Sequence, residues 1–447
     1  MRRQVLLAVM FVLVVQSVGC GGFRRLASDL ARMERSYLLS GMVTNAEDFD
    51  CDVWVVAVRW TPDGEVVSGV RTKVGKLGLF AFSVEDVEHW YVVAIADVNG
   101  DGRYDVGEPA WLHAGVDGRP EEIVFDRDEQ KAQVRGELRA DVVIPAELVA
   151  SARSFGETQS DAALEDARIP VDLGESVYLR CPVARADDGT CPRPTLKDDR
   201  FSAESGRRGL WEPLSDPLLS GVGIYVIGEY DPERTPVLFV YGAGGSAQNW
   251  RAFFEALDDG PFQPWFYRYP TGRRLGEMAS WLQGGTEILA SHLGVERFHV
   301  VAHSQGGLVA RAFLLQNLAS GRSPYIDTFV SISTPWDGHA MAQKGVDGAP
   351  AVVPSWRDLA PGSPFIEGLF AERLHGKIDH HLLFSYRGSR SLVQEPSNDG
   401  AVSVASQLKR EAQVDAVALY GFDRSHVDIL ADPEVIEIVE TVLTDSE

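Results

Sequence analysis

The sequence is poor in basic residues and has no apolar run long enough to serve as a permanent membrane span. Lys and Arg number 42 against 65 Asp and Glu, which gives a formal net charge of −23 over 447 residues. A surface of this sign repels phosphate backbones, so nucleic-acid binding is disfavoured. We find no internal repeats. The length predicts two or three domains, and the 45% hydrophobic content is enough for substantial cores.

The first 19 residues have the pattern of an export signal. A basic start, Met1-Arg2-Arg3, is followed by an apolar run over 5–15 and by small residues directly before Cys20. The run is too short to cross a bilayer permanently. The cysteine after the cleavage site resembles a bacterial lipobox, with Ser17 where that motif usually has Leu. The resemblance implies a lipidated Cys20 and an exported protein anchored to the bacterial cell envelope, in the outer membrane or periplasm.

Cysteines are few, at positions 20, 51, 181 and 191. Cys181 and Cys191 close a short segment rich in Pro, Asp and Gly, which favours a small disulfide loop in an oxidising compartment. Two unpaired thiols are the alternative. Cys51 has no obvious partner.

Residues 40–148 predict a small antiparallel β-sandwich of about seven strands, preceded by a tether or short helix over 20–39. Short apolar runs alternate with turn signals, and almost nothing in this range has helical spacing. The polar, weakly periodic stretch over 149–209 predicts a linker that holds the cysteine loop. The runs expected as strands are GMVT, VWVVAVRW, EVVSGV, LFAFSV, WYVVAIADV, EEIVF and ADVVIP.

A stretch inside the expected sandwich has the spacing of an EF-hand calcium loop, although no helices flank it. Oxygen side chains fall at positions 1, 3, 5, 9 and 12 of the stretch, with Gly at position 6. This spacing predicts a structural calcium site; an acidic hairpin with solvated side chains is the alternative. The expected ligands are Asp97, Asn99, Asp101, the Arg103 carbonyl, Asp105 and Glu108.

From residue 210 to 447 short apolar strands alternate with helices of 10–20 residues. This alternation predicts a mainly parallel sheet covered on both faces. Within it, the stretch RFHVVAHSQGGL reads as a strand, a sharp turn and a helix, with Ser304 at the turn. The pattern approximates the G-x-S-x-G nucleophile elbow, with Ala302 in place of the first glycine. A glycine-rich turn that merely contains a serine is the alternative.

A serine hydroxyl needs a base to act as a nucleophile, and the base usually needs an acid to orient it. Five histidines follow Ser304, and of these His426 lies between the last expected strand and the last expected helix. Asp399, after the preceding strand, is the expected acid, and Asp423 is its rival. The expected triad is therefore Ser304, Asp399 and His426.

Hydrolysis by such a triad also needs donors for a developing oxyanion. One is the backbone NH of Gln305, directly after the serine. The glycine-rich loop after the strand TPVLFV supplies the other, for which we choose Ala243. This loop lacks the Gly-Lys-Ser/Thr ending of a P-loop, so it does not indicate a phosphate cradle.

Five blocks in this order resemble the α/β-hydrolase superfamily, and within it bacterial lipases and esterases, over about half of the chain. They are VLFVYGAGGSAQNW, VVAHSQGGLVAR, SISTPWDGH, NDGAVSVAS and SHVDIL. Tyr241 departs from the family, which usually has His before the oxyanion glycine. In lipases the region that corresponds to the insertion over 336–380 caps the site, which implies a lid here; an ordinary surface helix pair is the alternative.

The residues and the resemblance together predict an exported serine hydrolase that cleaves carboxylic esters, lipid substrates included, and needs no cofactor for the chemistry. One alternative is an acyltransferase, or a lipid-anchor deacylase like the inositol-deacylase branch, with the same triad. The other is a surface adhesion protein whose hydrolase domain is degenerate and whose sandwich performs the recognition.

Overall fold

The computed structural model describes residues 21–61, 66–74, 78–85, 87–101, 104–127, 130–145, 148, 171–173, 195–227, 230–257, 260–321, 325–388 and 397–445. The chain forms two compact units. One comprises Met1–Leu30, Arg193–Asp216 and Gly223–Glu447, and the other comprises Ala31–Pro192 and Pro217–Val222.

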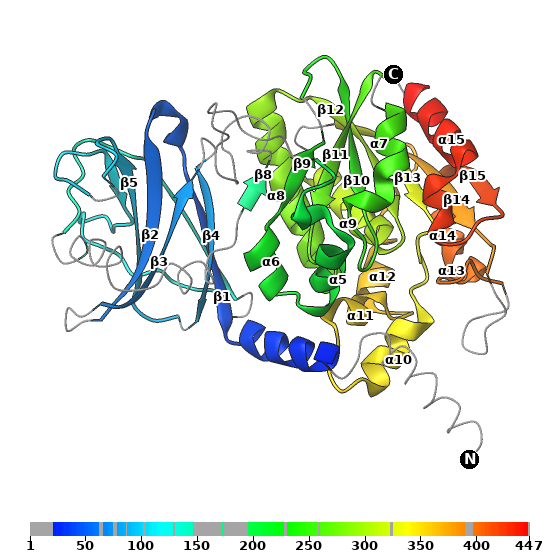
Figure 1. Cartoon of the computed structure of the whole chain (residues 1–447), viewed down its shortest axis with the longest axis horizontal. Helices are drawn as coiled ribbons and strands as arrows, with labels where there is room; N and C mark the ends of the chain where they lie inside the picture. Colours follow the sequence, from blue (N-terminus) through cyan, green and yellow to red (C-terminus); the bar gives the residue numbers. More distant parts are fainter. Residues whose placement is uncertain are drawn as a thin grey trace. The chain divides into compact units, whose positions relative to one another are not determined.

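The smaller unit is a sandwich of two sheets, drawn in blue to cyan in Figure 1. One sheet has the order β4-β1-β7 and the other β3-β2-β5-β6, and all pairs are antiparallel except β1 with β7. A short strand β8 (Val171–Leu173) belongs to the same unit. The sandwich strands are β1 (Ser36–Val43), β2 (Asp52–Trp60), β3 (Val66–Val74), β4 (Leu79–Glu85), β5 (Trp90–Asp97), β6 (Ala110–Leu112) and β7 (Lys131–Gly136), with η1 (Ala46–Asp48) after β1.

The two sheets share one apolar core, to which Leu39 of β1, Phe82 of β4, Val55 of β2 and Val92 of β5 contribute. The opposite face of β2 is buried as well, because Val56 and its neighbours pack into a second, smaller cluster. Burial on both faces explains why the run VWVVAVRW shows little alternation between polar and apolar residues.

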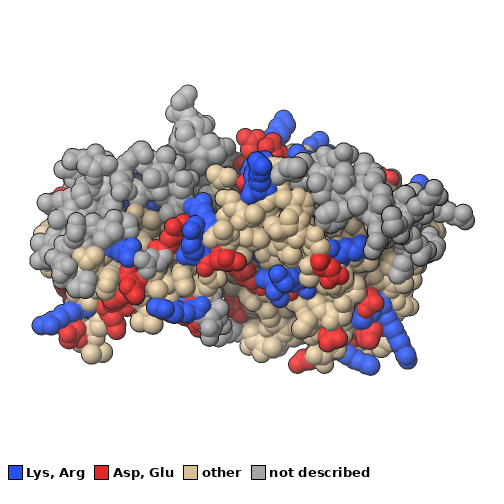
Figure 2. All heavy atoms as spheres, turned by 90° about the horizontal axis from the view of Figure 1, so that it is seen from below, with Lys and Arg blue, Asp and Glu red and all other residues tan. Residues whose placement is uncertain are grey.

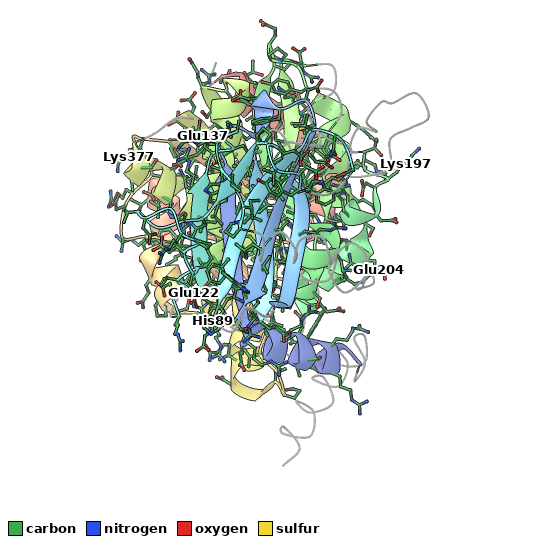
Figure 3. All side chains as sticks on the ribbon, turned by 90° about the vertical axis from the view of Figure 1, so that its left-hand side faces the viewer. His89, Glu122, Glu137, Lys197, Glu204 and Lys377 are labelled. Atoms are coloured by element: carbon green, nitrogen blue, oxygen red, sulfur yellow. The ribbon has the colours of Figure 1, made fainter. Side chains whose placement is uncertain are left out.

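Two of the seven expected strands are wrong. Residues 121–125 and 140–145 are irregular, and the strands β6 and β7 lie elsewhere. Ile123 and Phe125 are buried nonetheless, and the Ile123 amide donates to the Trp90 carbonyl (2.7 Å). The apolar run over 121–125 therefore indicates burial correctly, although these residues do not pair as a β-strand. The end of this loop is held by Glu122, which accepts from the His89 amide and lies beside the His89 ring (Figure 3).

The larger unit is built on a sheet whose strands run in the order β15-β14-β13-β12-β10-β11-β9. Every pair in this series is parallel except β11 with β9. The strands are β9 (Val222–Val226), β10 (Thr235–Val240), β11 (Phe262–Arg268), β12 (Arg297–His303), β13 (Tyr325–Ile332), β14 (Asp379–Ser385) and β15 (Ala416–Phe422).

Helices cover both faces of this sheet, as the alternation of strands and helices predicts. On β12, Phe298 stacks on Phe313 of α9, whereas His303 points to the other face and contacts Trp250 before α7. The helix α8 packs beside α9, and α15 packs beside α7. The helices are α5 (Ala203–Trp211), α6 (Ser215–Ser220), α7 (Arg251–Leu257), α8 (Leu275–Leu293), α9 (Gln305–Ser320), α10 (Ala340–Gly348), α11 (Pro354–Leu359), α12 (Pro364–Gly368), α13 (Val404–Gln407), α14 (Arg410–Asp415) and α15 (Pro433–Thr444), with short 3₁₀ turns η2 (Asp199–Phe201), η3 (Ala247–Trp250) and η4 (Asp428–Ala431).

The N-terminal part of this unit differs from the expected boundaries. Residues 21–33 are helical, and residues 21–30 belong to the larger unit. The end of the range expected as a linker is also structured, because η2 and most of α5 lie before residue 210. Buried Arg268 contacts both α5 and the start of α6, because it donates to Ser205 (2.8 Å) and to Asp216 (2.8 Å).

Charged side chains of the described residues are mixed on the molecular face drawn in Figure 2, where acidic and basic groups alternate over short distances. Opposite charges also form ion pairs at the surface, such as Arg297 with Asp327 (2.9 Å). Single exposed pairs of this kind contribute about 0–1 kcal/mol to stability each.

Candidate active site

Ser304 stands at a strained turn between β12 and α9. Its φ of 55° and ψ of −132° lie in a region that costs a non-glycine residue about 1–3 kcal/mol. The turn needs neighbours without side chains. A Cβ on Gly306 would lie 2.3 Å from the carbonyl oxygen of Val240, and one on Gly242 would lie 2.6 Å from the Cβ of Ser304. The tight turn holds the hydroxyl at the carboxyl end of the parallel strands, where α/β sheets bind their ligands.

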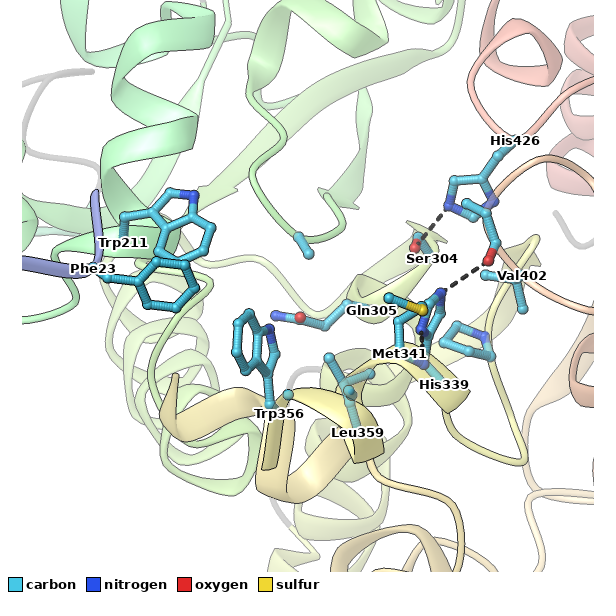
Figure 4. A pocket seen from close by; sticks show the side chains of 15 residues that line it. Phe23, Trp211, Ser304, Gln305, His339, Met341, Trp356, Leu359, Val402 and His426 are labelled. Carbon is cyan, nitrogen blue, oxygen red and sulfur yellow. Dashed lines mark hydrogen bonds between the residues drawn. The ribbon is translucent and has the colours of Figure 1, made fainter. Parts of the chain in front are cut away.

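The ring of His426, in the loop after β15, lies between Ser304 and Asp399. Its Nε2 is 2.9 Å from the Ser304 Oγ (Figure 4). Its Nδ1 is 2.7 Å from an oxygen of Asp399. A carboxylate only accepts, so Nδ1 carries the proton and Nε2 is left to accept from the serine hydroxyl. The structure therefore brings together the three side chains that the sequence singles out.

Asp399 is fully buried and makes several bonds besides the one to His426. Burial alone raises the pKa of this carboxyl. The hydrogen bond and charge of His426, together with hydrogen bonds from the Val402 and Ala401 amides, outweigh burial and lower the pKa below its ordinary value. Asp399 is thus held as the anion that His426 requires. Its other donors are Ala401 N (2.9 Å), Val402 N (2.7 Å), Ser385 Oγ (2.8 Å) and Gln407 Nε2 (3.0 Å).

The rival acid, Asp423, is exposed and pairs with Arg387 instead (3.0 Å). The hydrogen bond from Arg387 lowers the pKa of Asp423. The geometry therefore favours Asp399 as the partner of His426.

The two expected oxyanion donors flank Ser304. The backbone amides of Ala243 and Gln305 donate to no acceptor in the described part of the chain. Both residues line the same cavity as the Ser304 hydroxyl. Two free amides beside a nucleophile are the arrangement that stabilises a tetrahedral oxyanion.

Thr271 links the glycine-rich loop that follows β10 to the side chain of Gln305. Its hydroxyl accepts from the Gly244 amide (3.0 Å), and its carbonyl accepts from the Gln305 side chain (2.9 Å). Thr271 is fully buried in the loop that follows β11, and the sequence offered no signal for it.

Tyr241, the departure from the family pattern, also supports the oxyanion loop. Its hydroxyl donates to the Tyr269 carbonyl and accepts from the Tyr269 amide (2.9 Å), while the Tyr269 hydroxyl donates to the Tyr241 carbonyl (2.6 Å). Both rings are buried, so these bonds are shielded from water. The tyrosine thus fixes the start of the loop through an interlocked pair and leaves the backbone amides free.

His303, directly before the nucleophile, is a residue of the site that the sequence reading missed. Its Nε2 donates to the His426 carbonyl (2.8 Å), and the two rings are 4.6 Å apart. Burial and the neighbouring His426 lower the pKa of His303 to about 3. A neutral His303 therefore fixes the backbone of His426. The sequence could have indicated a role for His303 in the site, because this residue directly precedes Ser304.

The insertion over 336–380 forms α10, α11 and α12, and it contributes Met341, Trp356 and Leu359 to the wall of a cavity of about 300 Å³ over Ser304. Ile366 and Leu369 of the same insertion are buried outside that wall. His339 joins the insertion to the loop of Asp399, because its Nε2 donates to the Ala401 carbonyl (2.9 Å). Burial lowers the pKa of His339. The cavity is lined by Phe23, Trp211, Ala243, Ser304, Gln305, Pro335, His339, Met341, Ala342, Gly345, Trp356, Leu359, Ala401, Val402 and His426.

The expected calcium loop joins β5 to β6. Carboxylate oxygens there accept from amides of the loop itself: Glu108 from Val98 (2.9 Å) and from Asp105 (2.9 Å), and Asp97 from Asp101 (3.1 Å). The Asn99 side chain donates to Asp105 (2.8 Å). Among the residues that the structure describes, no group of three His, Cys, Asp or Glu side chains is arranged to hold a metal. Calcium binding stays a prediction.

Several predicted residues lie outside the described residues. They are Cys20 with the export signal, Cys181 and Cys191 of the expected disulfide, and Arg103 of the calcium loop. Cys51 is described and is a free, half-buried thiol.

Comparisons with known proteins bear on the fold. Residues 272–351 match the family described as "Alpha/beta hydrolase of unknown function (DUF915)". A search of curated proteins found no match.

Solved structures with a similar chain path include lipase BlEst2 of Bacillus licheniformis in mature form, with 15% identity and a TM-score of 0.38 over 48% of this chain and 93% of that one. Lipase B of Aspergillus fumigatus has 16% identity and a TM-score of 0.40 over 68% of each chain. Naproxen esterase of Bacillus subtilis has 15% identity and a TM-score of 0.32 over 49% of this chain and 86% of that one. Values this low carry no argument about the reaction.

The assignment of the fold therefore rests on the strand order, the serine turn and the family match. By these features, the unit that holds Ser304 has the α/β-hydrolase fold.

Proposed function

We propose that the protein is a serine hydrolase that cleaves carboxylic esters through an acyl-enzyme. The observation that carries this proposal is the continuous contact from Ser304 Oγ to His426 Nε2 (2.9 Å) and from His426 Nδ1 to Asp399 (2.7 Å). A serine with such partners is activated as a nucleophile at neutral pH.

In the first half-reaction, the Ser304 oxygen attacks the ester carbonyl while His426 takes the hydroxyl proton. The amides of Ala243 and Gln305 stabilise the resulting oxyanion. The bond from the carbonyl carbon to the leaving oxygen then breaks, and the alcohol takes the proton from His426. Asp399 stabilises the protonated ring and holds its orientation.

In the second half-reaction, water replaces the alcohol. His426 takes a proton from water, the hydroxide attacks the acyl-enzyme, and the proton returns to the Ser304 oxygen as the acid leaves. Every group in this cycle belongs to the chain itself, so the chemistry we propose requires no cofactor.

Hydrolysis of short p-nitrophenyl esters tests this proposal. We expect steady release of nitrophenol and acid by the wild type, and none above background by Ser304→Ala at an unchanged melting temperature. Full activity in Ser304→Ala would falsify the assignment. Product analysis with added alcohol separates hydrolysis from transfer, because an acyltransferase would yield the new ester in place of the acid.

We further propose that the chain is exported and anchored to the bacterial envelope by lipid on Cys20. The support is the export signal and the cysteine that follows it. Among the described residues, no helix is both long and apolar enough to cross a bilayer.

A further inference from the structure

The helix over residues 21–30 is seated on the catalytic unit by a buried carboxylate. Asp29 accepts from the Leu214 amide (2.6 Å), the Ser215 amide (3.0 Å) and the Ser215 hydroxyl. Leu26 of the same helix is fully buried, and Arg25 pairs with Glu212 (3.0 Å). Charge-assisted bonds of this kind are about twice as strong as neutral ones. The helix is therefore held in a defined position against the corner between α5 and α6.

This position places Phe23 in the wall of the cavity over Ser304. Its ring meets Trp211 of α5 edge to face, with 5.3 Å between centroids. Trp211 in turn meets Trp356 of α11, with 5.9 Å between centroids. Trp356 packs flat over Gly345, where a Cβ would lie 2.4 Å from the indole. Three separate segments thus form one aromatic wall, defined by Phe23, Trp211 and Trp356.

The cavity has a polar end and an apolar end. Figure 4 shows Ser304 and His426 on one side, Phe23 and Trp211 on the opposite side, and Trp356 between them. Among the described residues that line the cavity, none is Asp, Glu, Lys or Arg. A pocket of this kind favours an uncharged chain that extends from the reacting carbonyl toward the aromatic wall, because burying a charge there would leave it unpaired.

We propose that Phe23 is a specificity-determining residue, and that the helix over 21–30 completes an acyl-binding wall selective for neutral esters of medium-length aliphatic acids. This proposal rests on the proposed function. The cavity of about 300 Å³ is at the lower end of ligand-pocket volumes, about 300–1,000 Å³. On this proposal, the far end of a medium-length acyl chain contacts the aromatic wall, whereas an acetyl group stays beside Ser304.

The ratio of kcat/KM for p-nitrophenyl octanoate to that for p-nitrophenyl acetate tests this proposal. Phe23→Ala removes the ring that contacts the far end of the chain, so the ratio falls about tenfold. Phe23→Leu keeps an apolar side chain and lowers the ratio about threefold. Asp29→Ala leaves Phe23 intact but releases the helix, and it lowers the ratio as Phe23→Ala does. Ser28→Ala, an exposed change on the same helix, leaves the ratio at the wild-type value.

Labelling of the wild type by a small fluorophosphonate separates failure of this inference from failure of the proposed function. If Ser304 is labelled but Phe23→Ala and Asp29→Ala, both folded, keep the wild-type ratio, the wall does not select the chain and the inference is overturned alone. If Ser304 is not labelled, both proposals fail. Should Phe23→Ala not fold, Phe23→Leu and Asp29→Ala decide the question by the same ratio.

Discussion

The two aspartates considered as partners of His426, Asp399 and Asp423, differ in what surrounds their carboxylates. Asp399 is buried against the His426 ring, whereas Asp423 is exposed and paired with Arg387. Asp399→Asn removes the acceptor that fixes the proton on Nδ1, so the ring takes the wrong tautomer, and we expect kcat to fall by about 10⁴-fold. Asp423→Asn is the matched control and should leave kcat unchanged. Equal losses in the two variants would contradict the assignment.

Buried histidines make stability depend on pH. Burial lowers the pKa of His299 to about 4, and burial with the adjacent His426 lowers the pKa of His303 to about 3. The unfolded chain binds these protons near the ordinary pKa of about 6.5. Between that pH and the lowered values, only the unfolded state is protonated, so acidification favours unfolding. Asp399, whose pKa is also lowered, adds to the loss only at a still lower pH.

We therefore expect the free energy of unfolding to fall from pH 6.5 to pH 4 by about 1 kcal/mol per pH unit for each of these histidines. His299 tests this away from the serine, because both of its ring nitrogens lack partners in the described structure. We measure the free energy of unfolding of His299→Leu by urea titration at several pH values. It should change less steeply with pH than that of the wild type. A slope that is unchanged in this variant would mean that His299 does not titrate as its burial implies.

The contact of Ser304, His426 and Asp399 could be predicted from the sequence, because each of these residues follows a recognisable strand and the chain order places all three at the same edge of the sheet. The groups that hold the triad could not. Gln407 and Ser385 reach Asp399 from separate segments. Thr271 joins the glycine-rich loop to the Gln305 side chain only in the folded chain. Such partners are defined by tertiary contact, and no local pattern marks them.

At the scale of elements, the turn from β12 into α9 depends on close contact between helix and strand. A Cβ on Gly306 would lie 2.3 Å from the Val240 carbonyl oxygen. Gly306→Ala must push α9 away from β10, which should cost about 3 kcal/mol of stability. Displacement of Ser304 should lower kcat/KM at least about hundredfold.

Gly284 in the middle of α8 provides the control, because a Cβ there has no atom within 4 Å. Gly284→Ala should raise the free energy of unfolding by about 0.5–1 kcal/mol, since alanine is the better helix former. Thermal melts and ester kinetics on both variants test the pair. If Gly306→Ala were as stable and as active as Gly284→Ala, α9 would not lie as close to β10 as described.

Periodic and strongly apolar elements were predictable. The alternation of strands and helices predicted for residues 210–447 is present, and the runs TPVLFV and RFHVVAH form β10 and β12. The sandwich was harder, because its strands pair across long sequence distances and a buried run such as 121–125 need not join a ladder. The placement of residues 21–30 on the larger unit had no sequence signal either. It depends on Asp29 meeting backbone amides far along the chain.

At the scale of the whole molecule, the proposed lipid on Cys20 would tether the chain three residues before Phe23. Three residues span at most about 10 Å, so the rim of the cavity would lie close to the membrane surface. We expect Cys20→Ser to move the protein from the membrane fraction to the soluble fraction and to abolish incorporation of labelled palmitate. Hydrolysis of soluble acetate esters should persist, because Cys20 takes no part in the chemistry. Palmitate incorporation into Cys20→Ser would exclude this anchor.

The account depends most on the reactivity of one hydroxyl. Treatment of the intact protein with a fluorophosphonate, followed by digestion and mass spectrometry, identifies the residue that reacts. We predict a single adduct on Ser304, which is lost in Asp399→Asn and retained in Asp423→Asn. A protein that remains unlabelled, or an adduct on another serine, would contradict the central claim that Ser304 is the nucleophile.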